Sequence, residues 1–185
     1  MSRLVRRAAL IVIALLMACA VYLGWLQISG NFHAVIPGEV YRSAQMDGAQ
    51  LARWTQQHKI ASVLNLRGED DDAPWYREEV EAADRLGLSH IDFRMSASRA
   101  LNQDEVRRLM AVMRDAPKPL LIHCKAGSDR TGLAAALYKA MAGAGEAEAA
   151  AQLSIVYGHV ALPVSDAWPM DLTWEAVRPM LGYAP

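Results

Sequence analysis

Cys124 and Arg130 are the two residues whose types and spacing point most directly to chemistry. They stand six positions apart in the segment HCKAGSDRTG, residues 123–132, which directly follows the apolar run 120–122. A cysteine thiolate is a strong nucleophile, and a guanidinium group can bind two phosphate oxygens at once. The pair therefore indicates attack of sulfur on the phosphorus atom of a phosphate group.

The residues between the cysteine and the arginine are small and polar, and they include Gly127. A buried strand that enters such a loop and continues into a helix turns successive backbone N–H groups inward, which makes a cradle for an anion. Gly127 permits the tight bend, and Thr131 is placed so that its hydroxyl could bond the Cys124 sulfur. A free cysteine is often only a small buried hydrophobe, but that role does not need the loop around it. His123 has two open roles, a core histidine bonded to the backbone or a neighbour that tunes Cys124.

Alternating strand and helix patterns surround this loop and predict an α/β domain with a short central sheet. Asp47 and Asn102 stand where they would cap helices, and Gly87 stands where it would end one. We predict strands at 62–66, 89–93 and 120–122, and helices from Asp47, at 75–86, from Asn102, at 130–141, 146–157 and 171–181.

The first 28 residues differ from the rest of the chain. Arg3, Arg6 and Arg7 precede the run 8–26, in which every residue is apolar or glycine. As a helix this run would rise about 28 Å, close to the ~30 Å thickness of bilayer hydrocarbon. We therefore predict a basic cytoplasmic tail at 1–7, a transmembrane anchor or signal segment at 8–28, and a catalytic domain at 29–185.

Basic residues before a membrane span hold that end of the chain in the cytoplasm, so the domain should lie outside it, in the periplasm if the cell is a Gram-negative bacterium. Ala18-Cys19-Ala20 has the form of a signal-peptidase site, which leaves cleavage open. The apolar run continues beyond this motif to Leu26, which favours an uncleaved anchor.

Composition excludes several other classes of protein. The net charge is −1, with 19 basic and 20 acidic residues and no basic stripe, so nucleic acid is not an expected partner. Two cysteines cannot form a disulfide framework. The histidines lack metal-ligand spacing and no G-x-x-x-x-G-K-[ST] nucleotide-binding loop is present, so the residues give no support for a metal site or for a nucleotide site of that type.

The segment 123–132 resembles the signature of cysteine-dependent protein tyrosine phosphatases, specifically their bacterial dual-specificity-like branch. Residues 31–45 and 63–67 also resemble that branch, and the similarity covers roughly residues 31–160. It implies hydrolysis of phosphomonoesters through a phosphocysteine intermediate, without a metal or cofactor. By this resemblance Cys124 attacks phosphorus and Arg130 binds the phosphoryl group. The residues expected to form the phosphate loop are Lys125, Ala126, Gly127, Ser128, Asp129, Arg130 and Thr131.

The general acid is the point at which the chain departs from many members of that family. Their acid is an aspartate on a loop some thirty residues before the cysteine, where this chain has only Asp92, at the end of a predicted strand. Asp129 lies inside the phosphate loop beside Arg130, as in myotubularin-type lipid phosphatases. We favour Asp129, with Asp92 as the alternative acid and a helix cap as the alternative role of Asp129.

Three further groups are weaker candidates for a role in the site. Arg42 and Arg67 could line the phosphate pocket or form structural ion pairs, and the acidic run 69–72 could contact a basic substrate or simply be solvated. The expected function is a protein tyrosine or dual-specificity phosphatase that acts on a phosphorylated protein. The alternatives are a phosphoinositide or inositol-phosphate phosphatase and, from another class, a phosphate-binding module without turnover.

Overall fold

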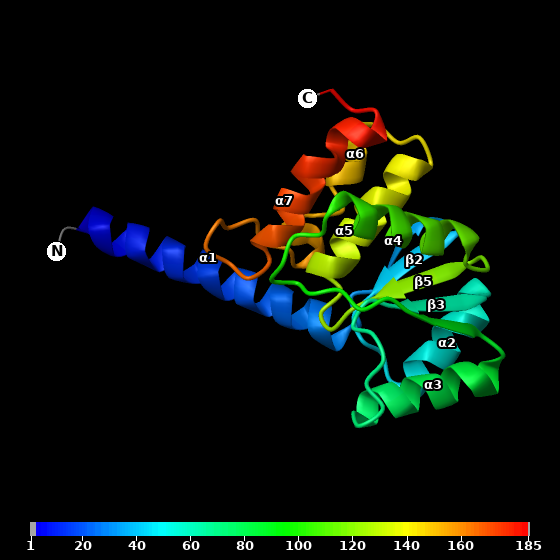
Figure 1. Cartoon of the computed structure of the whole chain (residues 1–185). Helices are drawn as coiled ribbons and strands as arrows, with labels where there is room; N and C mark the ends of the chain where they lie inside the picture. Colours follow the sequence, from blue (N-terminus) through cyan, green and yellow to red (C-terminus); the bar gives the residue numbers. More distant parts are fainter. Residues whose placement is uncertain (1–2, 185) are drawn as a thin grey trace.

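The computed structural model describes residues 3–184, and a five-stranded sheet forms the centre of the domain (Figure 1). The strand order is β1-β2-β5-β3-β4. β1 pairs antiparallel with β2, and all other neighbours are parallel. The predicted α/β class with a short, mostly parallel sheet is therefore confirmed. The strands are β1 (His33–Ile36), β2 (Val40–Ser43), β3 (Ser62–Asn65), β4 (Ser89–Asp92) and β5 (Leu120–His123).

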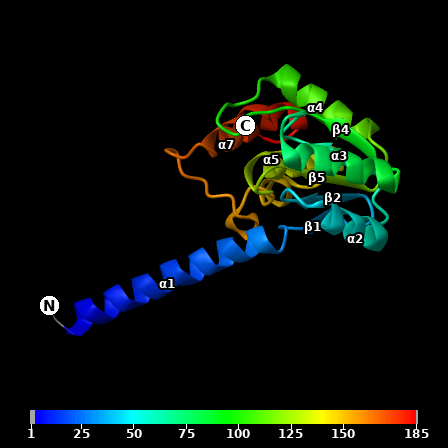
Figure 2. The same ribbon diagram turned by 90° about the horizontal axis from the view of Figure 1, so that it is seen from below.

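Helices cover both faces of this sheet (Figures 1 and 2). One layer holds α2 (Gly48–His58) and α3 (Pro74–Leu86), and the other holds α4 (Gln103–Asp115), α5 (Asp129–Met141), α6 (Glu146–Ala150) and α7 (Trp168–Val177). Short 3-10 helices lie at Ile155–Tyr157 and Arg178–Leu181.

The predicted helix ends are formed as the sequence indicates. Asp47 accepts a hydrogen bond from the Gln50 amide at 2.7 Å, and Asn102 accepts one from the Glu105 amide at 2.9 Å. In each case the third residue bonds back to the capping residue, which completes a capping box. Gly87 ends α3 with a φ of 67°.

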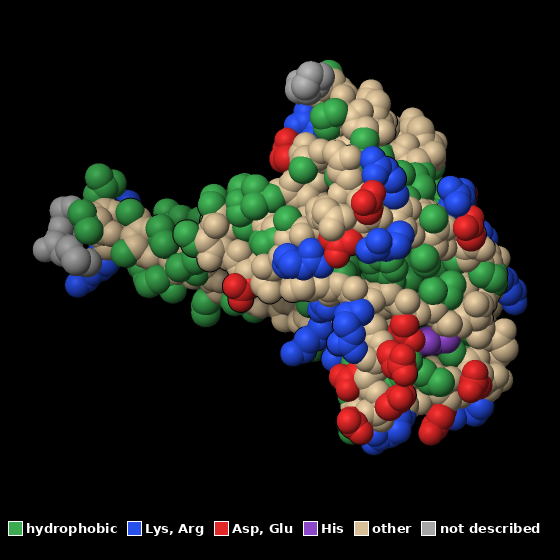
Figure 3. Space-filling model, viewed as in Figure 1, with side chains coloured by type: hydrophobic (Ala, Val, Ile, Leu, Met, Phe, Trp, Pro, Cys, Tyr) green, Lys and Arg blue, Asp and Glu red, His purple; other side chains and the backbone are tan. Residues whose placement is uncertain are grey.

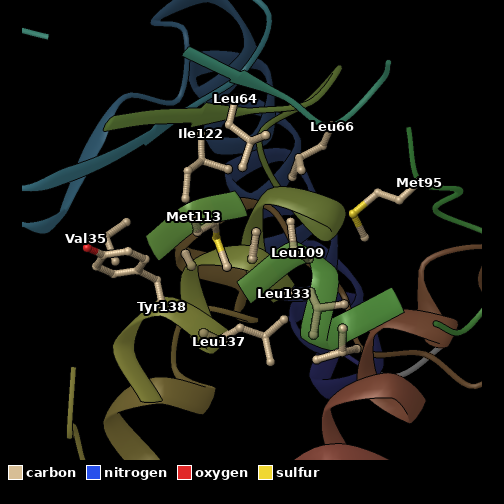
Figure 4. Packing of buried hydrophobic residues seen from close by; sticks show 14 of the residues in the cluster. Val35, Leu64, Leu66, Met95, Leu109, Met113, Ile122, Leu133, Leu137 and Tyr138 are labelled. Carbon is tan, nitrogen blue, oxygen red and sulfur yellow. The ribbon is translucent and has the colours of Figure 1, made fainter. Parts of the chain in front are cut away.

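β5 is buried along its whole length, and it separates the two parts of the core. Leu120 and Ile122 pack with residues of α4 and α5, among them Leu109 and Leu133 (Figure 4). Leu121 points to the opposite face, toward α2 and α3. Burial on both faces explains why this run is continuously apolar, and it fixes the position of the loop that follows.

Two predicted helices differ from the structure. The helix predicted at 146–157 ends at Ala150, because the chain beyond it turns so that the Gln152 carbonyl and side chain accept hydrogen bonds from Arg42, at 2.8 and 3.0 Å. The last helix begins at Trp168, before the predicted start at 171, with Pro169 in its first turn. Proline is tolerated there because those first N–H groups have no helical acceptor.

A single long helix, α1 (Arg3–Ile28), projects from the domain (Figure 1). By length and composition it could cross a membrane or serve as a signal sequence. Arg3, Arg6 and Arg7 lie within this helix, while residues 1–2 of the predicted tail are outside the described residues. Its last turns contact the domain, since Leu26 is 4% exposed and the Tyr22 hydroxyl donates to the Val156 carbonyl at 2.7 Å.

Candidate active site

Cys124 directly follows β5, and Asp129 begins α5, so the loop between them joins the central strand to a helix N-terminus. This is the predicted strand, loop and helix. The Cys124 side chain is buried at the base of the loop, while Lys125 is exposed at its outer side.

The carbonyl groups of this loop are all held by donors. The backbone N–H of Gln45 donates to the Lys125 carbonyl at 3.2 Å, and Asn31 Nδ2 donates to the Ala126 carbonyl at 3.0 Å. One nitrogen of Arg42 donates to the carbonyls of Gly127 and Ser128, at 2.8 and 3.3 Å. These contacts fix the orientation of each peptide group in the loop.

The N–H groups of the same loop are free. Within residues 3–184, no backbone N–H of 125–130 has a protein hydrogen-bond acceptor. Buried backbone donors are almost always paired, so a run of unpaired N–H groups at a helix N-terminus marks a place for an anion. The predicted cradle is therefore present in the geometry.

Arg130 is held beside this cradle by two backbone carbonyls. Its guanidinium donates to the carbonyls of Met95 and Leu66, at 3.3 and 3.5 Å. Arg67 lies close enough that burial and the positive charge of Arg130 both lower the pKa of Arg67. Arg67 also bonds Gln45 at 2.8 Å and stacks on the Trp75 ring at 3.3 Å. Two guanidinium groups therefore share this side of the site.

Thr131 lies at the inner side of the loop. Its hydroxyl is buried and has no hydrogen-bond partner within residues 3–184, so the expected bond to the Cys124 sulfur is not formed here.

Arg42 does not line the phosphate pocket. It is fully buried behind the loop, with its guanidinium 3.9 Å from the centre of the Tyr157 ring, and burial lowers its pKa to about 10. Its partners are carbonyl oxygens and Gln152, so it has no ion pair among residues 3–184, and the structural pair considered for it is not formed there. Arg42 instead buttresses the loop.

Asp92 lies at the end of β4, as predicted, and its carboxylate is already engaged. It accepts hydrogen bonds from Asn65 Nδ2 at 2.8 Å and from the Tyr76 hydroxyl at 2.7 Å. Burial and this bond to Asp92 raise the pKa of Tyr76. The exposed acidic run 69–72 follows β3 nearby.

Asp129 contacts His159, which in turn contacts Asp171, and neither of these two residues was predicted from the sequence. His159 Nδ1 lies 2.8 Å from Asp129, and His159 Nε2 lies 3.0 Å from Asp171. Burial opposes the charged form of His159, but its hydrogen bonds to the two carboxylates outweigh burial and raise its pKa. The carboxylate of Asp129 does not cap α5, so a helix cap is not its role.

His123 also pairs with a carboxylate, not with the backbone. Its Nε2 lies 3.1 Å from Glu79, which also contacts His90 at 2.8 Å and accepts a bond from Gln45. Burial would raise the pKa of Glu79, but the charge of His123 and these hydrogen bonds together lower it. Glu79 therefore ties α3 to the start of the phosphate loop.

His159, Asp171, Glu79 and Asn31 were missed because nothing in their spacing connects them to the loop. His159 stands in a segment with loop composition, and Asp171 stands at the start of a predicted helix. The packing of α7 against α5 brings Asp171 toward Asp129, and the chain between α6 and α7 brings His159 there.

The fold is shared with several solved phosphatase structures. TpbA of P. aeruginosa is 24% identical and aligns over 83% of this chain and 92% of its own, with a TM-score of 0.58. The catalytic core of the S. cerevisiae PP-IP phosphatase SIW14 is 18% identical over 84% and 94%, with a TM-score of 0.62. PTPMT1 is 12% identical over 82% and 98%, with a TM-score of 0.58. Comparison with curated proteins found no match.

A model of the tyrosine phosphatase family matches residues 23–154, which include the whole phosphate loop and the strands around it. The match covers well over half of the chain. The chain therefore belongs to the tyrosine phosphatase family, and it is a cysteine-dependent phosphatase of this type.

Proposed function

We propose that Cys124 is the nucleophile and that turnover passes through a phosphocysteine. The sulfur of the Cys124 thiolate attacks phosphorus, and the bond from phosphorus to the leaving oxygen breaks. Water then attacks the phosphocysteine, which releases inorganic phosphate and restores the thiolate. Arg130 and the N–H groups of 125–130 bind the phosphoryl oxygens in both steps.

The observation that carries this proposal is the arrangement of the loop. Its carbonyls are bonded on the outside by Gln45, Asn31 and Arg42, and its N–H groups have no acceptor within residues 3–184. Donors that are fixed before substrate arrives need no reorganisation when charge develops on the phosphoryl group, which is the basis of electrostatic catalysis.

Asp129 is the proposed general acid, and Asp92 is the alternative. Asp92 already accepts two hydrogen bonds, from Asn65 and Tyr76. Asp129 belongs to the loop itself, and its carboxylate lies 2.8 Å from His159 Nδ1. We propose that Asp129 gives its proton to the leaving oxygen and that His159 holds the carboxylate in place.

The test of the mechanism uses the full chain in detergent with p-nitrophenyl phosphate. Cys124→Ser should abolish turnover, because serine has no accessible anionic form near neutral pH. Arg130→Lys should also be severe, since a point charge cannot bind two oxygens in one plane. Cys19→Ser is the matched control, because Cys19 lies exposed on α1. Vanadate should inhibit and EDTA should not; loss of activity on chelation would contradict the mechanism.

We infer that the substrate is a phosphorylated protein, with phosphotyrosine as the first candidate residue. The family description supports this choice, and TpbA has been solved with phosphotyrosine. A phosphoinositide or inositol phosphate is the second candidate. Its support is the position of the phosphate loop against the end of α1, where Gln27 Nε2 lies 3.5 Å from the Ala126 carbonyl. PTPMT1 has been solved with PI(5)P.

One set of activity assays distinguishes the two substrate candidates from each other and tests whether the protein is instead a phosphate-binding module without turnover. The full chain is given a phosphotyrosine peptide, a phosphoserine peptide and phosphoinositides under the same conditions, with Cys124→Ser as the blank. Preference for either peptide supports the protein substrate, and preference for the lipids supports the second candidate. Hydrolysis that depends on Cys124 excludes a module without turnover.

We further propose that residues 8–28, which lie within α1, form an uncleaved anchor, with residues 1–7 as the cytoplasmic tail and 29–185 as the extracytoplasmic phosphatase domain. The support is the basic flank Arg3, Arg6 and Arg7 and the continuous helix through Ile28. A reporter that is active only outside the cytoplasm, fused after the last residue, should be active, and it should be silent when residues 1–28 are deleted. Recovery of a mature protein without these residues would replace the anchor with a signal peptide.

A further inference from the structure

An apolar segment beyond the phosphate loop is unusually exposed. Residues 155–164, here called the apolar segment, follow α6 and precede α7, and they contain no Asp, Glu, Lys or Arg; their titratable side chains are Tyr157 and His159. His159 is buried toward Asp129, so the outer surface of the segment carries no charge. The exposed members and their exposed fractions are Ile155 47%, Val156 53%, Val160 39%, Leu162 52% and Val164 96%.

The apolar segment lies next to α1. The Tyr22 hydroxyl bonds the Val156 carbonyl, and a side-chain carbon at Gly158 would lie 3.4 Å from Leu26 and 3.8 Å from Leu23. In both ribbon views the segment projects from the domain on the side from which α1 leaves it (Figures 1 and 2). In the space-filling view, hydrophobic side chains continue from α1 onto the neighbouring part of the domain (Figure 3).

The end of α1 marks the level at which a bilayer would meet water. Tyr22 and Trp25 are exposed near this end, and such aromatic side chains gather at membrane interfaces. Because Tyr22 is bonded to Val156, the apolar segment lies at this level. Contiguous apolar surface of this kind is uncommon on a soluble protein unless it contacts something.

We propose that the apolar segment is a second membrane contact, whose side chains enter the boundary between lipid headgroups and acyl chains. The proposal rests on the proposed anchor, since its occupant, the bilayer surface, follows from the continuity of the segment with α1. Apolar side chains at such a boundary are buried by roughly 5–10 Å. A lipid contact needs no complementary charge, which fits a surface that carries none.

This contact would position the active site. Asn31 Nδ2 donates both to the Tyr157 carbonyl in the apolar segment, at 2.9 Å, and to the Ala126 carbonyl in the phosphate loop, at 3.0 Å. The segment and the phosphate loop are therefore joined through one side chain. With two contacts to the bilayer, the domain cannot swing freely about the end of α1, and its phosphate loop stays near the membrane surface.

The experiment places one environment-sensitive NBD label on the full chain in lipid nanodiscs. Three single-cysteine forms are compared, all carrying Cys124→Ser. The first keeps native Cys19, which reports on the anchor. The second carries Cys19→Ala and Val164→Cys, and the third carries Cys19→Ala and Glu81→Cys as the matched exposed control on α3. Val164 is almost fully exposed, so its replacement disturbs no packing, and circular dichroism checks the fold.

Lipids that carry a spin label on the acyl chain quench a fluorophore in the bilayer, and aqueous iodide quenches one in water. We expect the label at Val164→Cys to lose fluorescence with the spin-labelled lipid and to emit at shorter wavelength than the label at Glu81→Cys. If it is quenched only by iodide while Cys19 is quenched by lipid, the second contact is refuted and the anchor stands. If Cys19 also escapes the lipid quencher, the anchor fails and the inference fails with it.

A second copy of the chain is the alternative occupant of this surface. In that case the emission shift at Val164→Cys would need two copies in a disc and would occur without lipid quenching. That result would also overturn the proposal. Hydrolysis of p-nitrophenyl phosphate by the unlabelled chain tests the proposed chemistry separately.

Discussion

Gly127→Ala is the change that most directly tests whether the shape of the phosphate loop matters. Gly127 has a φ of +73°, and a side-chain carbon at this position would lie 2.6 Å from the Ala44 nitrogen and from the Ser43 carbonyl carbon. It would also lie 2.7 Å from the Ser43 oxygen. All three are backbone atoms of the last residue of β2 and of the residue that follows it, so no side-chain rotation can relieve the contact.

The expected magnitude has two parts. A left-handed backbone costs a residue with a side-chain carbon about 1–2 kcal/mol. Beyond this, the contact must open from 2.6 Å to more than 3.4 Å, which moves the loop or the end of β2 by nearly 1 Å. A displacement of about 1 Å in a catalytic group can cost on the order of 10²-fold in rate. Gly127→Ala should therefore lower kcat/KM by about that factor.

Gly143→Ala is the matched control, because it introduces the cost of a left-handed backbone without the steric displacement of the loop. Gly143 has a φ of +82°, and a side-chain carbon there meets nothing within 4 Å. It follows the end of α5, at the opposite end of that helix from the phosphate loop. Gly143→Ala should therefore lower the free energy of unfolding through the strained backbone alone and leave kcat/KM unchanged.

The assay measures kcat/KM for p-nitrophenyl phosphate and the free energy of unfolding in urea for both variants. Both proteins should be less stable than the parent, and only Gly127→Ala should be strongly impaired in turnover. If Gly127→Ala hydrolyses the substrate as fast as Gly143→Ala, the shape of this loop does not control catalysis, and the proposed role of its N–H groups is wrong.

Three further predictions follow from the neighbouring contacts. Asp129→Asn should slow hydrolysis of substrates with poor leaving groups by about 10²–10⁴-fold and flatten the basic limb of the pH–rate profile, whereas Asp92→Asn should do neither; the reverse result would make Asp92 the acid. Because the pKa of His159 is raised in the folded state, its stabilising contribution should be complete below about pH 6.5 and be lost as the pH rises through that raised value, and His159→Gln should remove this part of the pH dependence of urea unfolding. Arg42→Met should lower the free energy of unfolding by about 1–3 kcal/mol, since it leaves buried carbonyls without donors, and an unchanged free energy of unfolding would contradict the role of Arg42 as a support of the loop.

Much of the fold could be predicted from the sequence because its signals are local. The capping residues Asp47 and Asn102 stand within three positions of their partners, and Gly87 ends α3 by its own conformation. The helix predicted across 146–157 begins as predicted but stops at Ala150, because the competing interaction is not local. Arg42 takes the carbonyl and side chain of Gln152, from 110 positions away, and the chain turns there.

The candidate site also contains residues that local sequence reveals and residues that only the fold brings together. Cys124 and Arg130 were recognisable because the loop that carries them is continuous in sequence. The contact between Asp129 and His159 spans 30 positions and depends on how the chain after α6 folds back toward α5. A histidine in a segment without helical or strand pattern has no sequence feature that marks such a partner, so only the structure could connect them.

The resemblance of residues 31–45 to the same family has a physical basis in this structure. The segment lies far from the phosphate loop in sequence, yet three of its residues donate hydrogen bonds to carbonyls of the loop. Asn31 donates to Ala126, and Arg42 donates to Gly127 and Ser128. The backbone N–H of Gln45 donates to Lys125. A loop that keeps its N–H groups free for phosphate must have its carbonyls satisfied elsewhere, because unpaired buried carbonyls are costly. Residues 31–45 satisfy them, so the two segments that resemble the family serve one requirement of the site.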